Sequence, residues 1–164
     1  MKVFIKNKLM SIGDGSSVLN ENNEPLYNVK GKLISPTKKK FMYDLNGNLL
    51  YTIRNKYWTF FCDKVIIYDA ENNKVATIKK NKFSFNLKYQ ILDSVDEMSI
   101  EGKFFRGTSN ILRNGEVAGV ITRDFSIIKD SFILTADEKD IPFFTAIVIA
   151  FDNIRDKKDK DLHD

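Results

Sequence analysis

The amino-acid sequence predicts a mainly β protein, a closed antiparallel barrel of about twelve strands around a hydrophobic helix near the carboxyl end. Two observations support this prediction. A strand–turn–strand pattern recurs along the chain, and it is followed by a segment at 141–151 that is apolar on almost every side. The length of 164 residues fits one domain. We expect this domain to span residues 1–153 and to be followed by a charged, flexible tail at 154–164.

The clearest hairpin has apolar side chains at alternate positions, namely Phe41, Tyr43, Leu49, Tyr51 and Ile53. This period of two is typical of strands with one buried face. A three-residue loop at 45–47 would pair Tyr43 with Leu49 and Phe41 with Tyr51, and it would keep both apolar sets on the inner face. The glycine that ends this loop suits a left-handed turn position next to a β-bulge.

Similar turns recur along the chain. Residues 68–73 match residues 43–48 at an offset of 25, with Asn72 in the left-handed position, and residues 111–116 match at an offset of 68. Looser turns are expected around residues 20–24, 93–96 and 129–130. Six hairpins at this spacing give about twelve strands.

The segment at 141–153 is predicted to be the helix. Carboxylates at 137–140 precede it and Pro142 lies in its first turn, as suits a helix N-terminus. Cations follow from Arg155, as suits a C-terminus. A continuous strand is the alternative, because the segment contains an Ile-Val-Ile run.

A helix that is apolar on every side must be buried. The eleven apolar residues span about 16 Å, whereas a bilayer core needs about 30 Å, so this helix should not cross a membrane. Twelve strands avoid exposed edges by closing, and a barrel of more than eight strands is too wide for its own side chains to fill. We therefore expect the helix inside the barrel, against hairpin faces rich in the thirteen Phe and six Tyr.

Positive charge is concentrated in the first half of the chain. Residues 1–82 hold 15 Lys and Arg against 7 Asp and Glu, whereas the other residues hold 11 against 15. Two clusters stand out, Lys38-Lys39-Lys40 and Lys79-Lys80-Asn81-Lys82. Such clusters attract anionic partners such as lipid headgroups. Exposed lysines also keep strands soluble and protect sheet edges, so this simpler interpretation stays open.

Four segments of the sequence resemble a known family. They are Met1-Lys2-Val3-Phe4-Ile5-Lys6, Tyr43-Asp44-Leu45-Asn46-Gly47-Asn48, the region 79–89 with Phe83, Phe85 and Tyr89, and Ala146-Ile147-Val148-Ile149-Ala150-Phe151-Asp152. The last is the most specific. The chain resembles the LURP-one-related family, which belongs with the tubby C-terminal domain and the phospholipid scramblases. The resemblance spans residues 1–153 and implies a twelve-stranded barrel around a central carboxyl-terminal helix.

The resemblance implies little about function. Tubby domains bind phosphoinositide headgroups, scramblases are associated with bilayers and calcium, plant members are linked to defence, and bacterial members are largely uncharacterised. The scramblase calcium segment corresponds to residues 135–140, which we interpret as the start of the helix, so no calcium site is expected. The cysteine-rich palmitoylated stretch has no counterpart, because Cys62 stands alone.

No residue pattern predicts an enzyme, a cofactor or a metal site. The single His, His163, lies in the predicted tail, so no Ser or Cys has an ordered histidine base. Cys62 is expected to be a buried thiol. Residues 13–17 lack the spacing of a phosphate-binding loop, and the carboxylates at 93–101 show no catalytic spacing. The single Cys and the absence of a signal sequence predict a cytoplasmic location.

We expect a non-enzymatic binding domain. Its partner could be an anionic phospholipid, a membrane surface or a protein. Five candidate ligand-binding cations flank adjacent turns: Lys30, Lys32, Lys38, Lys39 and Lys40. Gathered at one end of the barrel, they could hold a headgroup phosphate and place the protein at the periphery of a membrane.

The alternative is a protein-interaction module, which predicts an apolar or aromatic patch on the outer barrel wall. Tyr57 or Trp58 could dip into a lipid interface, and a role in the core is the simpler interpretation. Nucleic acid is not an expected partner, because the net charge is only +4 and no basic–aromatic stripes are evident.

Overall fold

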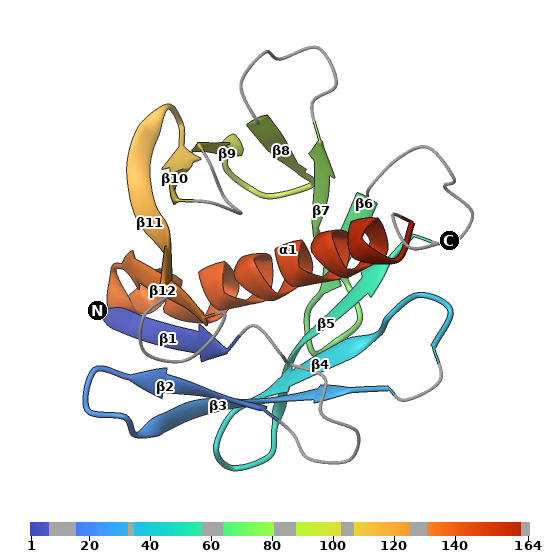
Figure 1. Ribbon diagram of the computed structural model, residues 1–164, viewed down its shortest axis with the longest axis vertical. Helices are drawn as coiled ribbons and strands as arrows, with labels where there is room; N and C mark the ends of the chain where they lie inside the picture. The colour runs from blue at the N-terminus through green and yellow to red at the C-terminus, as the bar shows by residue number, and fades with distance from the viewer. Residues whose placement is uncertain are drawn as a thin grey trace.

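The computed structural model describes residues 1–6, 16–32, 35–56, 64–80, 88–102, 107–124 and 131–161. These residues form twelve antiparallel strands in a closed barrel, in which each strand pairs with its sequence neighbours and β1 also pairs with β12 (Figure 1). The predicted fold class is therefore confirmed. The strands are β1 (Lys2–Lys6), β2 (Ser16–Asn20), β3 (Pro25–Gly31), β4 (Lys40–Tyr43), β5 (Leu49–Asn55), β6 (Lys64–Tyr68), β7 (Lys74–Lys80), β8 (Lys88–Leu92), β9 (Met98–Gly102), β10 (Thr108–Arg113), β11 (Glu116–Asp124) and β12 (Ser131–Ala136).

The turns of β4–β5 and β6–β7 have the same geometry, as their matching sequences predict. The Asp44 carboxylate accepts hydrogen bonds from the backbone and side-chain N–H groups of Asn48, at 2.8 and 2.7 Å. Asp69 holds Asn73 in the same way, at 2.7 and 3.0 Å. Gly47, with φ of 87°, and its counterpart at residue 72, with φ of 66°, occupy the predicted left-handed position.

The turn between β10 and β11 differs from this prediction. Arg113 pairs directly with Glu116, so only two residues form the loop. Asn114 and Gly115 both have positive φ, 52° and 84°, which is typical of a type I′ turn. The predicted turn at residues 129–130 lies outside the described residues.

Four hairpins contain one extra residue at equivalent places, because the register shifts there in β2–β3, β4–β5, β6–β7 and β10–β11. The extra residues are all apolar, partly buried and packed against the core: Leu26, Leu50, Val75 and Ala118. Each bulge therefore adds one side chain to the core near the turns.

The bulge at Leu50 overturns part of the predicted β4–β5 register. Tyr43 pairs with Leu49 as predicted, but Phe41 pairs with Thr52 and not with Tyr51. The inward residue between them is Met42, which is fully buried, whereas the two β4 aromatic rings lie half-buried on the outer face. The predicted inner face was therefore wrong for β4, because one extra residue reverses the side-chain alternation, whereas Tyr51 and Ile53 of β5 face the core as predicted.

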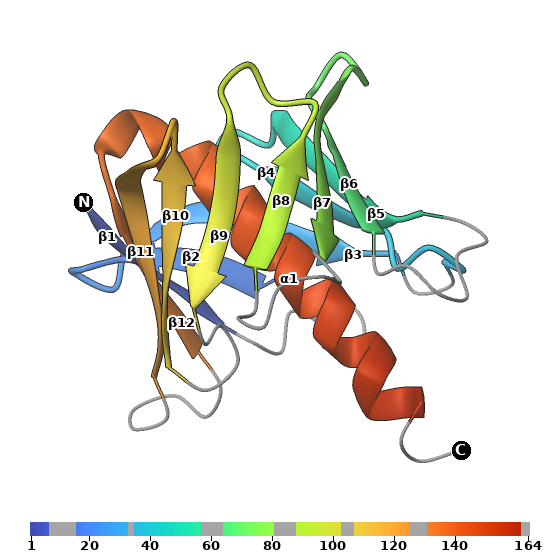
Figure 2. The same cartoon turned by 90° about the horizontal axis from the view of Figure 1, so that it is seen from above.

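The carboxyl-terminal helix α1 (Ile141–Asp161) runs through the barrel after a short 3₁₀ turn, η1 (Glu138–Asp140) (Figures 1 and 2). Every residue from Phe144 to Phe151 is 0% exposed. The inward strand residues around the helix are mostly Val and Ile, and the Tyr89 ring packs edge-on against Phe151 at 4.6 Å between centroids. The helical prediction is confirmed, and the strand alternative for this segment was wrong.

The helix is longer than predicted. It begins at Ile141, as predicted, but it continues to Asp161, beyond the predicted end at residue 153. Ile154 is also buried, at 2% exposed. Figure 2 shows the last turns extending beyond the strands. Polar residues with adequate helix propensity can continue a helix whose first turns are held by packing.

Arg113 fixes the start of the helix to β10. Its guanidinium donates two hydrogen bonds to the Asp140 carboxylate, at 3.0 and 2.7 Å, and it lies 5.4 Å from the centre of the Phe144 ring. Its Nε atom lies 3.3 Å from the Asp96 carboxylate. Hydrogen bonds from Arg113 lower the pKa of Asp140 below its usual value. Residues 135–140 thus lead into the helix, as the sequence predicted.

Replacing Ile147 with Ala tests the buried helix. This side chain is 0% exposed, so its truncation should lower the free energy of unfolding by roughly 2–5 kcal/mol in urea denaturation. Val95→Ala is the control, because Val95 is fully exposed in the β8–β9 turn, and it should change stability by less than about 0.5 kcal/mol. Equal effects of the two substitutions would contradict the burial of the helix.

Asp140→Asn tests the ion pair through its pH dependence. The substitution should cost roughly 1–3 kcal/mol at pH 7 in urea denaturation. Because the folded-state pKa of Asp140 is lowered, this stability is present above the unfolded pKa of about 3.9 and is lost as the pH falls through the lower folded value. The free energies of unfolding of the wild type and the variant should therefore converge in acid. A difference of the same size at pH 3 and pH 7 would show that Asp140 does not act through its charge.

Candidate functional site

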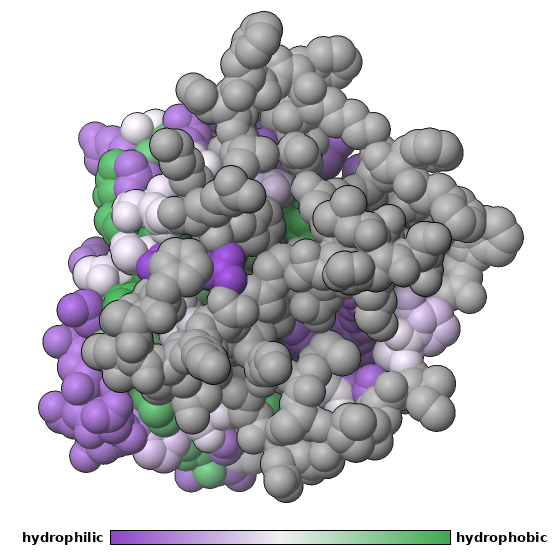
Figure 3. All heavy atoms as spheres, in the orientation of Figure 1, coloured by the Kyte–Doolittle hydropathy of each residue, from purple (hydrophilic) through white to green (hydrophobic). Residues whose placement is uncertain are grey.

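The two ends of the barrel differ in charge. All five described hairpin turns and the start of α1 lie at one end, which we call the hairpin end, and most of their charged residues are acidic. These acidic residues are Glu21, Glu24, Asp44, Asp69, Glu71, Asp93, Asp96, Glu97, Glu116, Asp137, Glu138 and Asp140. In Figure 3 hydrophilic residues gather over the β2–β3 hairpin at the lower left.

The outer wall of β3–β7 is basic. None of these five strands contains an Asp or Glu. Their outward positions and the residues next to the strands hold seven cations, which we call the basic face: Lys30, Lys32, Lys39, Arg54, Lys56, Lys64 and Lys79. This arrangement follows from strand alternation, because the neighbouring inward residues Val29, Ile53, Val65 and Ile78 are buried against the helix.

The cations of the basic face have no carboxylate partner among the described residues. Other cations do have one: Lys74 pairs with Asp93, and Lys88 pairs with Glu101 across β8 and β9. No cation of the basic face forms such an ion pair with the residues that the structure describes. Over the described residues, the basic face therefore carries positive charge that no ion pair neutralises.

Three cations of the basic face lie over aromatic rings. The Lys30 ammonium lies 5.6 Å from the centre of the Tyr43 ring, and Lys39 lies 5.3 Å from the ring of Phe41. The third cation, the Arg54 guanidinium, lies 4.8 Å from the Tyr68 ring and donates a 2.6 Å hydrogen bond to its hydroxyl. Such cation–π contacts limit the side chains to fewer conformations.

The structure brings together three of the five predicted ligand-binding lysines. Lys30 and Lys32 are exposed and Lys39 is half-buried on the basic face. Lys40 is only 1% exposed and points inward from β4, so it does not lie on the basic face. Lys38 is partly buried and has a positive φ of 47°.

The helix and β5 fix the segment that contains these lysines. The side-chain amide of Asn153, which is fully buried in α1, donates a 3.0 Å hydrogen bond to the Lys38 carbonyl. The backbone N–H of Asn55 donates to the Thr37 carbonyl at 2.8 Å. Lys39 therefore has its position set by the core of the barrel.

Sequence reasoning missed Arg54, Lys56 and Lys64 as members of the basic face. Each stands apart from the lysine clusters in sequence, and only strand pairing brings it beside them. Lys79 is on the basic face and thus shares it with Lys39, a point that the sequence left open. Outside what the structure describes lie the Lys80 side chain, Lys82, Tyr57, Trp58, Cys62 and His163.

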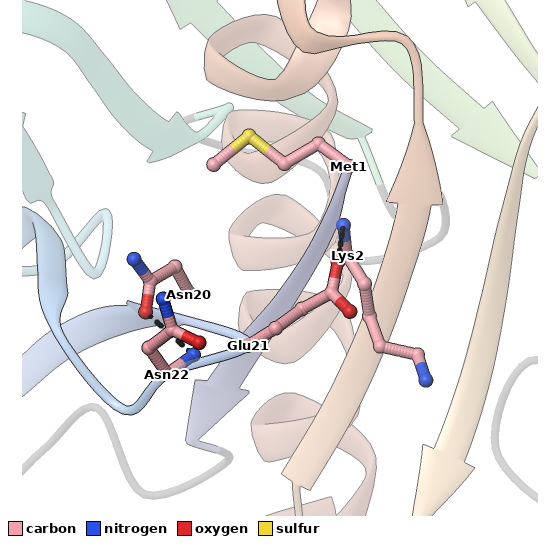
Figure 4. Close-up of a pocket in the computed structure, with 5 residues that line it drawn as sticks. All are labelled: Met1, Lys2, Asn20, Glu21 and Asn22. Carbon is pink, nitrogen blue, oxygen red and sulfur yellow. Dashed lines mark hydrogen bonds between the residues drawn. The ribbon is translucent and has the colours of Figure 1, made fainter.

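A shallow recess of about 310 Å³ lies at the hairpin end, lined by Met1, Lys2, Asn20, Glu21 and Asn22 (Figure 4). Its polar groups stabilise the fold. Asn20 accepts hydrogen bonds from the backbone N–H of Asn22 and of the residue at position 24, and Glu21 accepts one from the Lys2 N–H at 3.1 Å. This recess therefore offers no group that is poised for chemistry.

In the part of the chain that the structure describes, no helix combines the length and apolar character needed to cross a bilayer. Over the same residues, His, Cys, Asp and Glu side chains form no group of three or more that could hold a metal ion.

The family model described as LURP-one-related matches residues 1–152. Neither the curated proteins nor the solved structures include a match to the chain.

Substitution of Lys40 and of its neighbour Lys39 by Glu tests where the two side chains lie. Lys40→Glu places a carboxylate in a buried position, and it should lower the free energy of unfolding by roughly 3–5 kcal/mol. Lys39→Glu changes the same charge on the outer face and should change stability by less than about 1 kcal/mol. Thermal unfolding measures both. Similar losses of stability would mean that Lys40 is not buried.

Proposed function

The chain belongs to the LURP-one-related family, and we propose that it is a non-enzymatic binding domain that docks on anionic phospholipid membranes through the basic face. The observation that supports this proposal most strongly is the uncompensated charge of β3–β7. Seven cations share one wall with no ion-pair partner among the described residues, while Lys74 and Lys88 elsewhere are paired. A Lys or Arg near an anionic membrane surface contributes about 1 kcal/mol.

Protection of sheet edges is not an explanation for these lysines. Lysines often block edge strands from pairing with other chains, but β3–β7 are internal strands of a closed barrel and have a partner on both sides. Solubility alone requires no segregation of charge, and it is served equally well by mixed signs. The separation of the acidic hairpin end from the basic face is what a docking surface requires.

A second candidate function is binding of a protein partner at the hairpin end. Large hydrophobic side chains are exposed there, including Leu92 at 43%, Val95 at 106% and Val117 at 58%. Leu92 and Val95 belong to the β8–β9 hairpin, and Val117 belongs to the β10–β11 hairpin. The acidic residues around them would oppose an anionic membrane, so this end would suit a protein with basic and apolar groups.

Vesicle co-sedimentation tests the membrane proposal. The protein should bind phosphatidylcholine vesicles that contain 30% phosphatidylglycerol at low salt, and binding should weaken as salt rises because the charges are exposed. The triple variant Lys30→Glu, Lys32→Glu and Lys39→Glu should bind at least roughly 100-fold more weakly, since three favourable charges are lost and three repulsive charges are added.

The matched control changes the same number of exposed lysines at the hairpin end, with Lys2→Glu, Lys74→Glu and Lys139→Glu. It should bind within about threefold of the wild type, because these residues lie away from the basic face. No binding of the wild-type protein at low salt would disprove the proposal, and so would equal losses in the two variants.

A further inference from the structure

We propose that the basic face meets the membrane with two parallel rows of cations and responds to the density of negative charge, not to the identity of one headgroup. This inference rests on the proposed function and adds the contact geometry and the class of surface recognised. The first row is Lys32, Lys39 and Arg54, and the second row is Lys56, Lys64 and Lys79.

The second row follows from the register of β5, β6 and β7. Lys64 and Lys79 are directly paired residues of β6 and β7. On the other side, the Lys56 N–H donates a 3.0 Å hydrogen bond to the Lys64 carbonyl, which continues the β5–β6 ladder beyond the pair Asn55 and Val65. The three lysines are therefore neighbours across three adjacent strands.

The first row lies two residues away on the same wall. The Lys32 N–H donates a 2.9 Å hydrogen bond to the Lys39 carbonyl, so these two lysines are opposite each other. Lys40 pairs with Ile53, which places Lys39 beside Arg54. The two rows meet on β5, where Arg54 and Lys56 are two residues or about 7 Å apart, and the six positive positions extend across five adjacent strands spaced about 4.8 Å apart.

Rows of like charge destabilise an isolated sheet. Like charges that face each other directly across a strand pair are unfavourable, and here Lys64 and Lys79 do so without a described carboxylate beside them. Local conflicts of this kind are expected at functional sites, where a ligand supplies the compensation. A partner with negative charge spread over both rows would offset the repulsion between these cations.

The shape of the wall favours an extended surface over a small ligand. Sites for small molecules are concave and surround their ligand, whereas the outer wall of a closed barrel curves away from anything that contacts it. A single headgroup there would touch few of the six cations. A bilayer that contains anionic lipid presents many negative charges in one plane, and the long side chains of several of these cations can reach it from adjacent strands.

The aromatic rings argue against single-stranded nucleic acid as the occupant. Binding of single strands uses exposed ring faces on which bases stack. The rings of Phe41, Tyr43 and Tyr68 are half-buried, and each already has a cation of the basic face over it. They are therefore poorly placed to stack with bases.

The test uses the full chain, two kinds of vesicle and a neutral variant of the second row. Phosphatidylcholine vesicles contain either phosphatidylglycerol or phosphatidylserine at the same fraction, and this fraction is varied. The variant is Lys56→Gln, Lys64→Gln and Lys79→Gln, and its control is Lys2→Gln, Lys74→Gln and Lys139→Gln. We expect equal binding to the two lipids at equal charge and a roughly 100-fold loss in the row variant alone.

Stability provides a second measurement, independent of vesicles. Because the row variant removes repulsion between like charges, its thermal midpoint should equal or exceed that of the wild type. A lower midpoint would overturn the argument that the row is a local conflict.

The outcomes separate this inference from the proposed function. If the wild type binds neither vesicle at low salt, the proposed function fails and the inference fails with it. If it binds and the row variant binds equally well, the inference fails while the proposed function survives. A tenfold preference for one headgroup at equal charge would overturn recognition by charge density. Tighter binding to single-stranded or duplex nucleic acid than to vesicles would overturn the membrane as the occupant.

Discussion

The structure depends on the burial of one apolar helix inside a barrel that cannot be filled without it. Twelve strands enclose more space than their own side chains occupy, and the fully buried residues 144–151 occupy this space. The fit is close: a Cβ atom at Gly119 would lie 3.0 Å from the Phe144 ring, so the absence of a side chain lets β11 approach the helix. The helix in turn needs the barrel, because an element that is apolar on every side is stable only when it is buried.

This constraint also determines where the charges lie. Most of the alternate strand residues that face the helix are apolar, so most polar residues lie on the outer wall and in the turns, with Lys40 and Ser109 among the buried exceptions. Hairpin chemistry places Asp and Asn in the turns at one end, where Asp44 and Asp69 organise the loops. The outward positions of β3–β7 hold cations instead. Three of these cations lie over aromatic rings, and none forms an ion pair with a carboxylate that the structure describes.

Much of the fold could be predicted because it is encoded in local patterns. The Asn and Gly turn positions, the strand alternation and the apolar segment at 141–151 each have one physical interpretation that fits the others.

The exceptions have identifiable causes. The bulge at Leu50 depends on the fit of that side chain in the assembled core, and nothing in its own sequence indicates it. The helix end was placed too early because a helix anchored by its buried part can continue through polar residues. The basic face was predicted only in part. Lys39 and Arg54 become neighbours only through the strand register, which the sequence does not show. The burial of Lys40 follows from the same bulge that turns Phe41 outward.

Native-state hydrogen exchange tests most directly whether the helix is the centre of the fold. If the barrel closes around it, the amides of residues 144–151 can exchange only when the whole barrel opens, and their exchange free energy should equal that of the paired strands β11 and β12 and the global free energy of unfolding. Exchange of these helical amides at a free energy several kcal/mol below that of the strands would show that the helix can leave while the barrel persists, which would contradict this account.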